Sequence, residues 1–214
     1  MKIGLVGLAG SGKDTVALML MEKLRDEHNT QFRIERFASP LKQVSSLIFG
    51  TSFDGRDVKE VVVPINPDTV LDHTFYLLME VLKFDDAQMD KAGELYADTI
   101  GQYDALSPRL YQQLLGTEIV RTIDPEAWVK RLARHKYDLL CPDARFANES
   151  SIMDKLILIQ RHPVPKGELH PSEVYAADLQ SLDYPEQYVD YIITNDGTFQ
   201  DLETKVSELA KRIL

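Results

Sequence analysis

Short apolar runs alternate with longer amphipathic stretches along most of the chain. Five of these runs have the length and composition of buried strands, and they lie at residues 2–6, 32–37, 137–141, 156–160 and 190–194. The stretches between them carry apolar residues at helical spacing. A further such stretch follows the last strand and opens with a capping pair, Thr198 and Asp201. Strands that alternate with helices predict an α/β fold, a doubly wound parallel five-stranded sheet with helices on both faces.

The long stretch between the second and third strands is predicted to be mostly helical. Ser39 with Pro40, and Ser107 with Pro108, each resemble a helix start, with serine as the N-cap and proline at the first helical position. The second of these helices is expected to run to Ile123. We interpret residues 51–104 as a largely helical insertion within a single domain of 214 residues. Its acidic part, residues 84–104, is expected to form a solvated face.

A glycine-rich turn follows the first strand and leads into a helical pattern that begins at Lys13. Strand, glycine loop, Gly-Lys and helix form the context that a phosphate-binding loop requires. The backbone N–H groups can converge on anionic oxygens, the helix N-terminus adds partial positive charge, and Lys13 supplies a full one. The alternative is a turn that merely joins a strand to a helix. The residues predicted to hold phosphate are Ala9, Gly10, Ser11, Gly12, Lys13, Asp14 and Thr15.

Asp14 departs from the usual loop pattern. The residue after the lysine is normally Ser or Thr, which binds Mg²⁺, whereas here the hydroxyl comes one position later at Thr15. A carboxylate beside phosphates is repulsive unless a cation intervenes, so we expect Asp14 to engage Mg²⁺, directly or through water. Asp143, at the end of the third long strand, is also placed to hold Mg²⁺ through water or to orient the loop.

Four polar residues recur at steps of four along the helix that starts at Ser107, namely Arg109, Gln113, Thr117 and Arg121. Steps of four keep side chains on nearly one helical face. Such a stripe could bind a phosphate at one end and a base edge or sugar at the other, or it could be an ordinary polar outer face. Gly116 favours binding, because a mid-helix glycine costs about 1 kcal/mol and close approach of a ligand or another backbone would compensate.

Further charged residues follow the later strands. Arg145 could reach a transferred phosphoryl group with Glu149 as its orienting partner, although an Arg-Glu surface pair has the same spacing. Arg161 and His162 could contribute to a closing lid. The stretch from His170 to Glu173 lies in a loop that would suit a mobile segment.

Composition narrows the function classes. A net charge of −10 argues against non-specific nucleic-acid binding, because such proteins carry a basic surface. No apolar run reaches the roughly 18 residues that span a bilayer, and we expect neither a targeting segment before the first strand nor a membrane partner. Cys141 is the single cysteine and cannot form an internal disulfide, which favours a reducing cytoplasm.

Several motifs together resemble the phage-type deoxynucleoside monophosphate kinases, a branch of the phosphate-loop kinases. The resemblance covers most of the chain and weakens between residues 51 and 104. The motifs are Gly-Ser-Gly-Lys-Asp-Thr in the loop, Phe37-Ala38-Ser39-Pro40-Leu41-Lys42, Gln113-Leu114-Leu115-Gly116-Thr117-Glu118 with Arg121 and Trp128, Asp143-Ala144-Arg145-Phe146-Ala147-Asn148-Glu149, and Asn195-Asp196-Gly197-Thr198.

The resemblance implies transfer of a phosphoryl group from ATP, with Mg²⁺, to a deoxynucleoside monophosphate. It implies that the loop holds the ATP phosphates, that Asn195 lies near the adenine, and that Arg145 and Glu149 lie between acceptor and donor. Lys13, Arg121 and Arg145 are the expected catalytic residues. The implied acceptor residues are Lys42, Arg109, Gln113, Thr117, Arg121 and Trp128.

The resemblance leaves other readings open. A phage origin would place the protein in the host cytoplasm, and a homodimer is left open. Another small-molecule kinase, such as a dephospho-coenzyme A kinase, shares the loop. A nucleotide-dependent switch is the alternative from another class, although the Asn-Lys-x-Asp guanine motif does not occur in the sequence.

Overall fold

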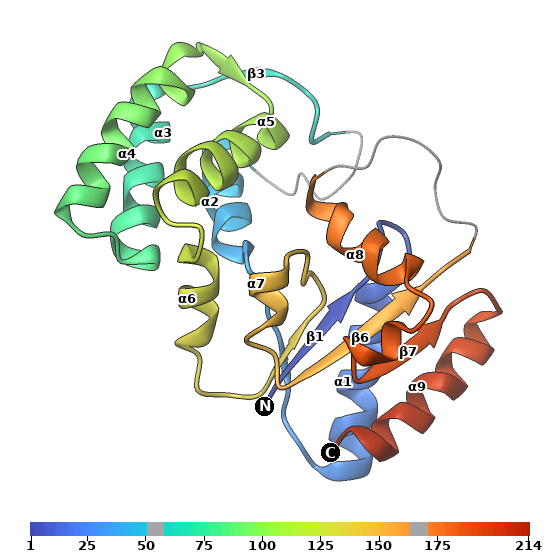
Figure 1. Cartoon of the computed structure of the whole chain (residues 1–214). Helices are drawn as coiled ribbons and strands as arrows, with labels where there is room; N and C mark the ends of the chain where they lie inside the picture. The colour runs from blue at the N-terminus through green and yellow to red at the C-terminus, as the bar shows by residue number, and fades with distance from the viewer. Residues whose placement is uncertain (51–57, 163–170) are drawn as a thin grey trace. The chain divides into compact units, whose positions relative to one another are not determined.

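The computed structural model describes residues 1–50, 58–162 and 171–214 (Figure 1). The chain divides into two compact units. Unit 1 comprises residues 1–37 and 135–214, and unit 2 comprises residues 38–134. The predicted insertion at 51–104 falls inside unit 2 and is shorter than it, and its residues 51–57 lie outside the described ranges.

Unit 1 is built on a five-stranded sheet in the order β2-β5-β1-β6-β7. All four pairings between neighbouring strands are parallel. The five predicted strands are therefore all present, and the predicted parallel sheet is confirmed. The strands are β1 (Lys2–Val6), β2 (Arg33–Ile34), β5 (Leu139–Cys141), β6 (Lys155–Gln160) and β7 (Tyr191–Thr194).

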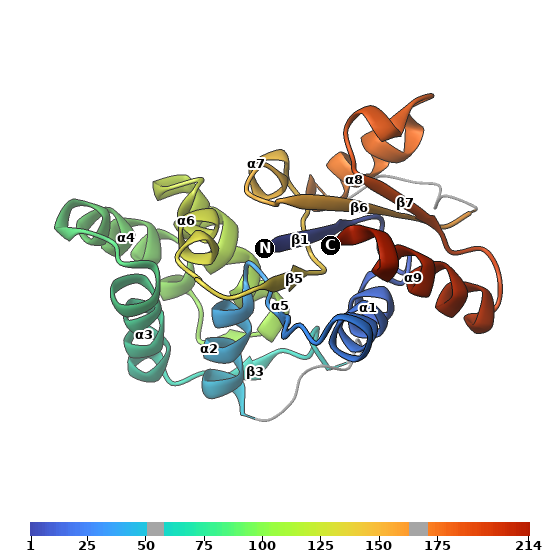
Figure 2. The same ribbon diagram turned by 90° about the horizontal axis from the view of Figure 1, so that it is seen from below.

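Helices cover both faces of this sheet. The long helices α1 and α9 pack against one another on one face, and α8 lies on the other (Figure 2). Thr198 and Asp201 form the predicted capping box, which fixes the start of α9. The core of the unit is apolar, with Leu5, Leu20 and Val206 fully buried. The helices are α1 (Lys13–His28), α7 (Ala147–Ser150), α8 (Pro171–Ser181), the short 3₁₀ turn η4 (Pro185–Gln187) and α9 (Phe199–Ile213).

The carboxyl ends of the parallel strands meet at one edge of the sheet, the edge where such sheets bind ligands. The glycine loop follows β1 there, Arg161 follows β6, and Asn195 follows β7. Strand β2 is shorter than predicted. The Glu35 N–H still donates to the Leu140 carbonyl at 3.0 Å, and the chain leaves the sheet at Arg36. Arg36 is thereby placed at the same edge.

Unit 2 is mainly helical, with a core that includes the fully buried side chains of Tyr111 and Leu115. Two strands of two residues each, β3 and β4, pair antiparallel and were not predicted, because so short a run carries no periodic pattern. The elements are α2 (Ser39–Phe49), β3 (Val63–Pro64), α3 (Pro67–Tyr76), η1 (Leu77–Leu82), α4 (Asp86–Asp98), η2 (Ile100–Gln102), β4 (Ala105–Leu106), α5 (Pro108–Gln113), η3 (Leu114–Arg121) and α6 (Ala127–Ala133).

Of the two N-caps predicted for helices of unit 2, one is correct and one is wrong. Ser107 is the N-cap of α5, and its hydroxyl accepts a hydrogen bond from the Leu110 N–H at 3.2 Å. Ser39 is not an N-cap. Helix α2 already includes it, and Ala38 takes the cap position without a side-chain hydrogen bond. The helix predicted to run to Ile123 does so without a break, but its second half, η3, is wound as a π-helix.

The acidic segment behaves as the charge pattern predicts. Helix α4 buries only Ala92, so its carboxylates lie on a solvated surface. Asp85 has a further role, because it forms a capping box with Gln88 at the start of α4.

Cys141 ends β5 as a buried residue, and as the single cysteine it has no partner for an internal disulfide. Within the described ranges no helix combines the length and the apolar character that crossing a membrane demands. The same ranges hold no cluster of three or more His, Cys, Asp or Glu side chains able to enclose a metal ion.

Candidate functional site

Two glycines of the loop between β1 and α1 combine a positive φ with a close neighbour. Gly12 has φ of +98°, and a Cβ there would lie 2.5 Å from Nδ2 of Asn195. Gly7 has φ of +158°, and a Cβ there would lie 2.4 Å from the carbonyl oxygen of Ile159. The glycines therefore let the loop pass close to β6 and to the residue after β7.

The carbonyl groups of the loop are held by side chains from three different elements. Lys13 Nζ donates to the carbonyls of Gly7 and Leu8 at 2.7 and 2.8 Å. Arg161 donates to Gly10 O at 3.1 Å, and Asn195 donates to Ser11 O at 2.8 Å. In a planar trans peptide the N–H points opposite to the C=O. Fixing these carbonyls therefore directs the following N–H groups away from the side chains that hold them.

Lys13 lies where several charged groups converge. Burial lowers the pKa of its ammonium group, and the positive charge of Arg145 lowers it further. The carboxylates of Asp14, Glu173 and Asp143 act in the opposite direction. Two predicted catalytic residues, Lys13 and Arg145, are thus brought into one electrostatic environment, together with both predicted metal ligands.

Asp14 already has a cationic partner. Its Oδ1 accepts a hydrogen bond from the Arg36 guanidinium, although the carboxylate side chain remains 69% exposed. Asp143 Oδ1 accepts from the Phe37 N–H at 3.3 Å, which ties the end of β5 to the end of β2. The cation that the sequence requires beside Asp14 is therefore present as Arg36, and Mg²⁺ ligation by Asp14 stays a prediction.

The predicted contact between Arg145 and Glu149 includes a backbone hydrogen bond. The Arg145 N–H donates to Glu149 Oε2 at 2.8 Å. Glu149 is only 2% exposed, whereas Arg145 is exposed. Glu149 therefore holds the turn that presents the Arg145 side chain.

Residues after the last two strands form a second charged group at the loop. His162 donates its backbone N–H to Asp196 Oδ1 at 2.7 Å, and its ring Nδ1 lies 2.8 Å from Asp196 Oδ2. These bonds hold the pKa of Asp196 below its usual value, the backbone bond most strongly. The Asn195 N–H bonds the Gln160 carbonyl at 2.8 Å, so the neighbouring residues Arg161 and Asn195 reach the loop from adjacent strands.

The polar stripe on α5 and η3 lies on the outside of unit 2. Arg109, Gln113 and Thr117 are exposed, and Arg121 is half-buried. The Arg109 guanidinium lies 3.3 Å from the Glu60 carboxylate in an exposed ion pair. The side chains are accessible to solvent. Both a ligand-binding face and an ordinary polar outer face require such access, so their position does not decide between these two interpretations. Lys42, on α2, is exposed as well.

Trp128, a predicted acceptor residue, and Gly116 both serve packing. Trp128 is 2% exposed, and its indole N–H donates to the Gly116 carbonyl at 3.3 Å. It belongs to the core of unit 2 and positions η3, and its role in acceptor binding stays a prediction. Gly116 does permit a close approach, but by a side chain: a Cβ there would lie 2.8 Å from Leu41 Cδ2. No ligand is needed to explain this glycine.

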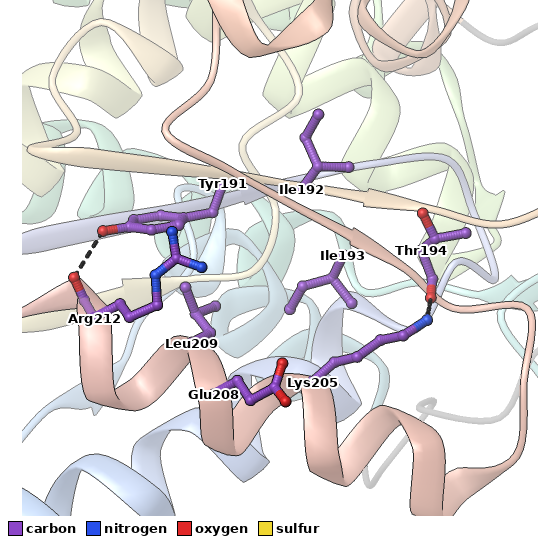
Figure 3. Close-up of a pocket in the computed structure, with 8 residues that line it drawn as sticks. All are labelled: Tyr191, Ile192, Ile193, Thr194, Lys205, Glu208, Leu209 and Arg212. Atoms are coloured by element: carbon purple, nitrogen blue, oxygen red, sulfur yellow. Dashed lines mark hydrogen bonds between the residues drawn. The ribbon is translucent and has the colours of Figure 1, made fainter.

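A separate open pocket of about 260 Å³ lies between β7 and α9 (Figure 3). None of the predicted site residues lines it. Tyr191 donates its hydroxyl to the Arg212 carbonyl at 2.9 Å, and Lys205 donates to the Thr194 carbonyl at 2.5 Å. These bonds hold α9 against the edge strand, which gives the lining residues a packing role.

No family model and no curated protein sequence matches this chain. The convergence of Lys13, Arg161 and Asn195 on one glycine loop, with the charge of Arg145 acting on Lys13, is the arrangement within unit 1 that most favours a ligand site.

Sequence reasoning missed two residues of this arrangement. Arg36 was not predicted because the second strand was expected to run to Phe37, which placed Arg36 inside the strand and not at its end. The available signal was that Arg36 lies just before residues 38–42, where a helix was predicted to start. Glu173 accepts from the Ala9 N–H at 2.9 Å, across 164 residues of sequence. Nothing local in the sequence indicates so distant a contact. His170, next to it in the same predicted loop, lies outside the described residues.

Proposed function

We propose that the protein is an ATP-dependent kinase of the phosphate-loop type that converts deoxynucleoside monophosphates to diphosphates. One observation carries the proposal. A glycine loop follows the central strand β1, Lys13 stands at the start of α1, and side chains that include Lys13 bond the carbonyl groups of the loop. Loops of this kind bind phosphate through backbone N–H groups, the helix N-terminus and the lysine. The motifs that resemble deoxynucleoside monophosphate kinases supply the substrate class.

The proposed donor site is the loop from Ala9 to Thr15. Ser11 supports it, because its hydroxyl is buried inside the loop and has no hydrogen-bond partner among the described residues. A buried unpaired hydroxyl costs about 1–3 kcal/mol, and a phosphate oxygen that reaches the loop could relieve that cost. In this proposal Lys13 leaves the carbonyls of Gly7 and Leu8 and turns to the nucleotide, and Asn195 lies toward the adenine.

The residues present fit a magnesium ion that is held mainly by the nucleotide. Mg²⁺ commonly binds one or two carboxylates and keeps phosphate and water as its other ligands, so a cage of three acidic residues is not required. Asp14 and Asp143 are the carboxylates that would hold it, and both act on Lys13 electrostatically. When bound, the ion neutralises phosphate charge; Asp14 would exchange its Arg36 contact for it.

The proposed chemistry asks the chain for alignment and positive charge. Phosphoryl transfer passes through a loose transition state with charge on three oxygens, and the acceptor phosphate is already anionic near pH 7, so no strong general base is needed. Lys13 and Arg145 would stabilise the transferred group, and Arg121 the acceptor phosphate. The other proposed acceptor residues are the exposed Lys42, Arg109, Gln113 and Thr117.

A coupled assay of ATP consumption over deoxynucleoside and ribonucleoside monophosphates tests the proposal. We expect turnover with one or more deoxynucleoside monophosphates and its loss in Lys13→Ala with the fold retained. Turnover with dephospho-coenzyme A alone would favour the related kinase, and tight nucleotide binding without acceptor-stimulated turnover would favour a switch. The proposed setting is a reducing cytoplasm, in which the buried Cys141 stays reduced.

A further inference from the structure

A carboxylate occupies one backbone donor of the glycine loop. Glu173 Oε1 accepts from the Ala9 N–H at 2.9 Å, and Glu173 lies in the first turn of α8, which begins beside the loop (Figure 1). The charge of Glu173 also acts on Lys13 and raises its pKa against the larger effect of burial. The acid therefore bonds the loop and is close enough to influence its lysine.

This contact has the chemistry of a phosphate contact. A backbone N–H that meets a carboxylate oxygen makes the same charge-assisted bond that it would make to a phosphate oxygen, at the same range of distances. In this state Lys13 is also engaged internally, with Nζ on the carbonyls of Gly7 and Leu8. Both a neutral donor and a cation of the proposed donor site are thus satisfied by the protein itself.

We propose that Glu173 is a built-in competitor for the anion site, an autoinhibitory contact that an incoming polyphosphate must displace from the Ala9 N–H. The inference rests on the proposed function, since it takes the loop to be a phosphate site. It assigns to α8 control over access to the loop: the loop binds phosphate more weakly while Glu173 is in place. Displacing the carboxylate frees Ala9 N–H and removes a negative charge from beside the bound phosphates.

The opposite role is a structural tie in which Glu173 supports the loop for binding. The two roles predict opposite effects of removing the charge. If Glu173 competes, its loss tightens polyphosphate binding; if Glu173 supports the loop, its loss leaves binding equal or weaker.

The test uses the full chain and isothermal titration with two probes, inorganic pyrophosphate and magnesium-free ATP. Glu173→Gln keeps an oxygen that can accept from Ala9 but removes the charge, and Glu173→Ala removes both. Asp178→Asn is the matched control, because it makes the same charge change at an exposed position of the same helix. Thermal unfolding of each variant verifies that it is folded.

We expect both Glu173 variants to bind each probe about tenfold more tightly than the wild type, and Asp178→Asn to stay within about twofold. Tenfold corresponds to ~1.4 kcal/mol, about the size of a hydrogen bond to a charged group. Equal or weaker binding by folded Glu173 variants, with clear binding by the wild type, overturns this inference and leaves the proposed function standing. Failure of all four proteins to bind either probe overturns the proposed function, and the inference with it.

Discussion

Gly12 offers the sharpest test of the loop geometry. It combines φ of +98° with a neighbour, Asn195 Nδ2, only 2.5 Å from where a Cβ would stand. Gly12→Ala therefore introduces two separate costs, backbone strain and a clash with an amide that is already hydrogen-bonded to Ser11 O. Gly10 isolates the first cost, because its φ is +75° and nothing lies within 4 Å of an added Cβ.

The magnitudes follow from these two environments. A left-handed conformation costs a non-glycine residue about 1–2 kcal/mol, and the smaller entropy of the unfolded alanine chain returns about 0.4–1 kcal/mol. Gly10→Ala should therefore lower the free energy of unfolding by about 1 kcal/mol. Gly12→Ala adds the displaced Asn195 hydrogen bond, worth about 1 kcal/mol, for a total loss of about 2 kcal/mol.

Urea unfolding followed by circular dichroism measures both variants against the wild type. The clash can be removed in advance by Asn195→Ala, and in that background Gly12→Ala should cost only about as much as Gly10→Ala, because the strain alone remains. Equal stability of the two single glycine variants, or strict additivity of Gly12→Ala with Asn195→Ala, would refute the close approach of Asn195 to the loop.

Three further substitutions probe the lysine, the acid and the tryptophan. Lys13→Met should abolish ATP binding. Burial also holds the pKa of Lys13 below 10.5, so the unfolded state binds more protons than the folded state at alkaline pH. In urea unfolding the wild type should therefore gain stability relative to Lys13→Met between pH 7 and pH 10, and a constant difference in stability would contradict the lowered pKa. Asp14→Asn should raise the Mg²⁺ concentration for half-maximal ATP turnover severalfold. An unaltered Mg²⁺ dependence would mean that Asp14 serves to bind Arg36 and does not hold Mg²⁺. Trp128→Phe should lower the free energy of unfolding by about 1 kcal/mol, because the Gly116 carbonyl loses its indole donor; a full retention of stability would argue against that bond.

The parts of the fold that could be predicted are those with a strong local pattern. Strands β1 and β6 have the predicted ends within a residue, because each is a continuous apolar run buried in a parallel sheet. The capping box of α9 and the N-cap of α5 were also predictable, since each depends on side chains within four residues of one another.

The parts that could not be predicted depend on contacts between distant residues. The π-helical winding of η3 follows no sequence periodicity, and Trp128 could be assigned to the core only once its bond to Gly116 was visible. The loop was recognisable from its glycines, but Glu173 and Arg36 reach it from other elements. Sequence patterns thus identified the loop as a candidate site and left out Glu173 and Arg36, two charged residues that bond it.

The most direct measurement of the central claim is ATP consumption by the purified chain with Mg²⁺ and a panel of deoxynucleoside monophosphates. We expect acceptor-dependent ADP formation with at least one of them, and loss of that activity in folded Lys13→Ala. ATP consumption that no deoxynucleoside monophosphate stimulates, or that survives in Lys13→Ala, would contradict the proposed kinase function.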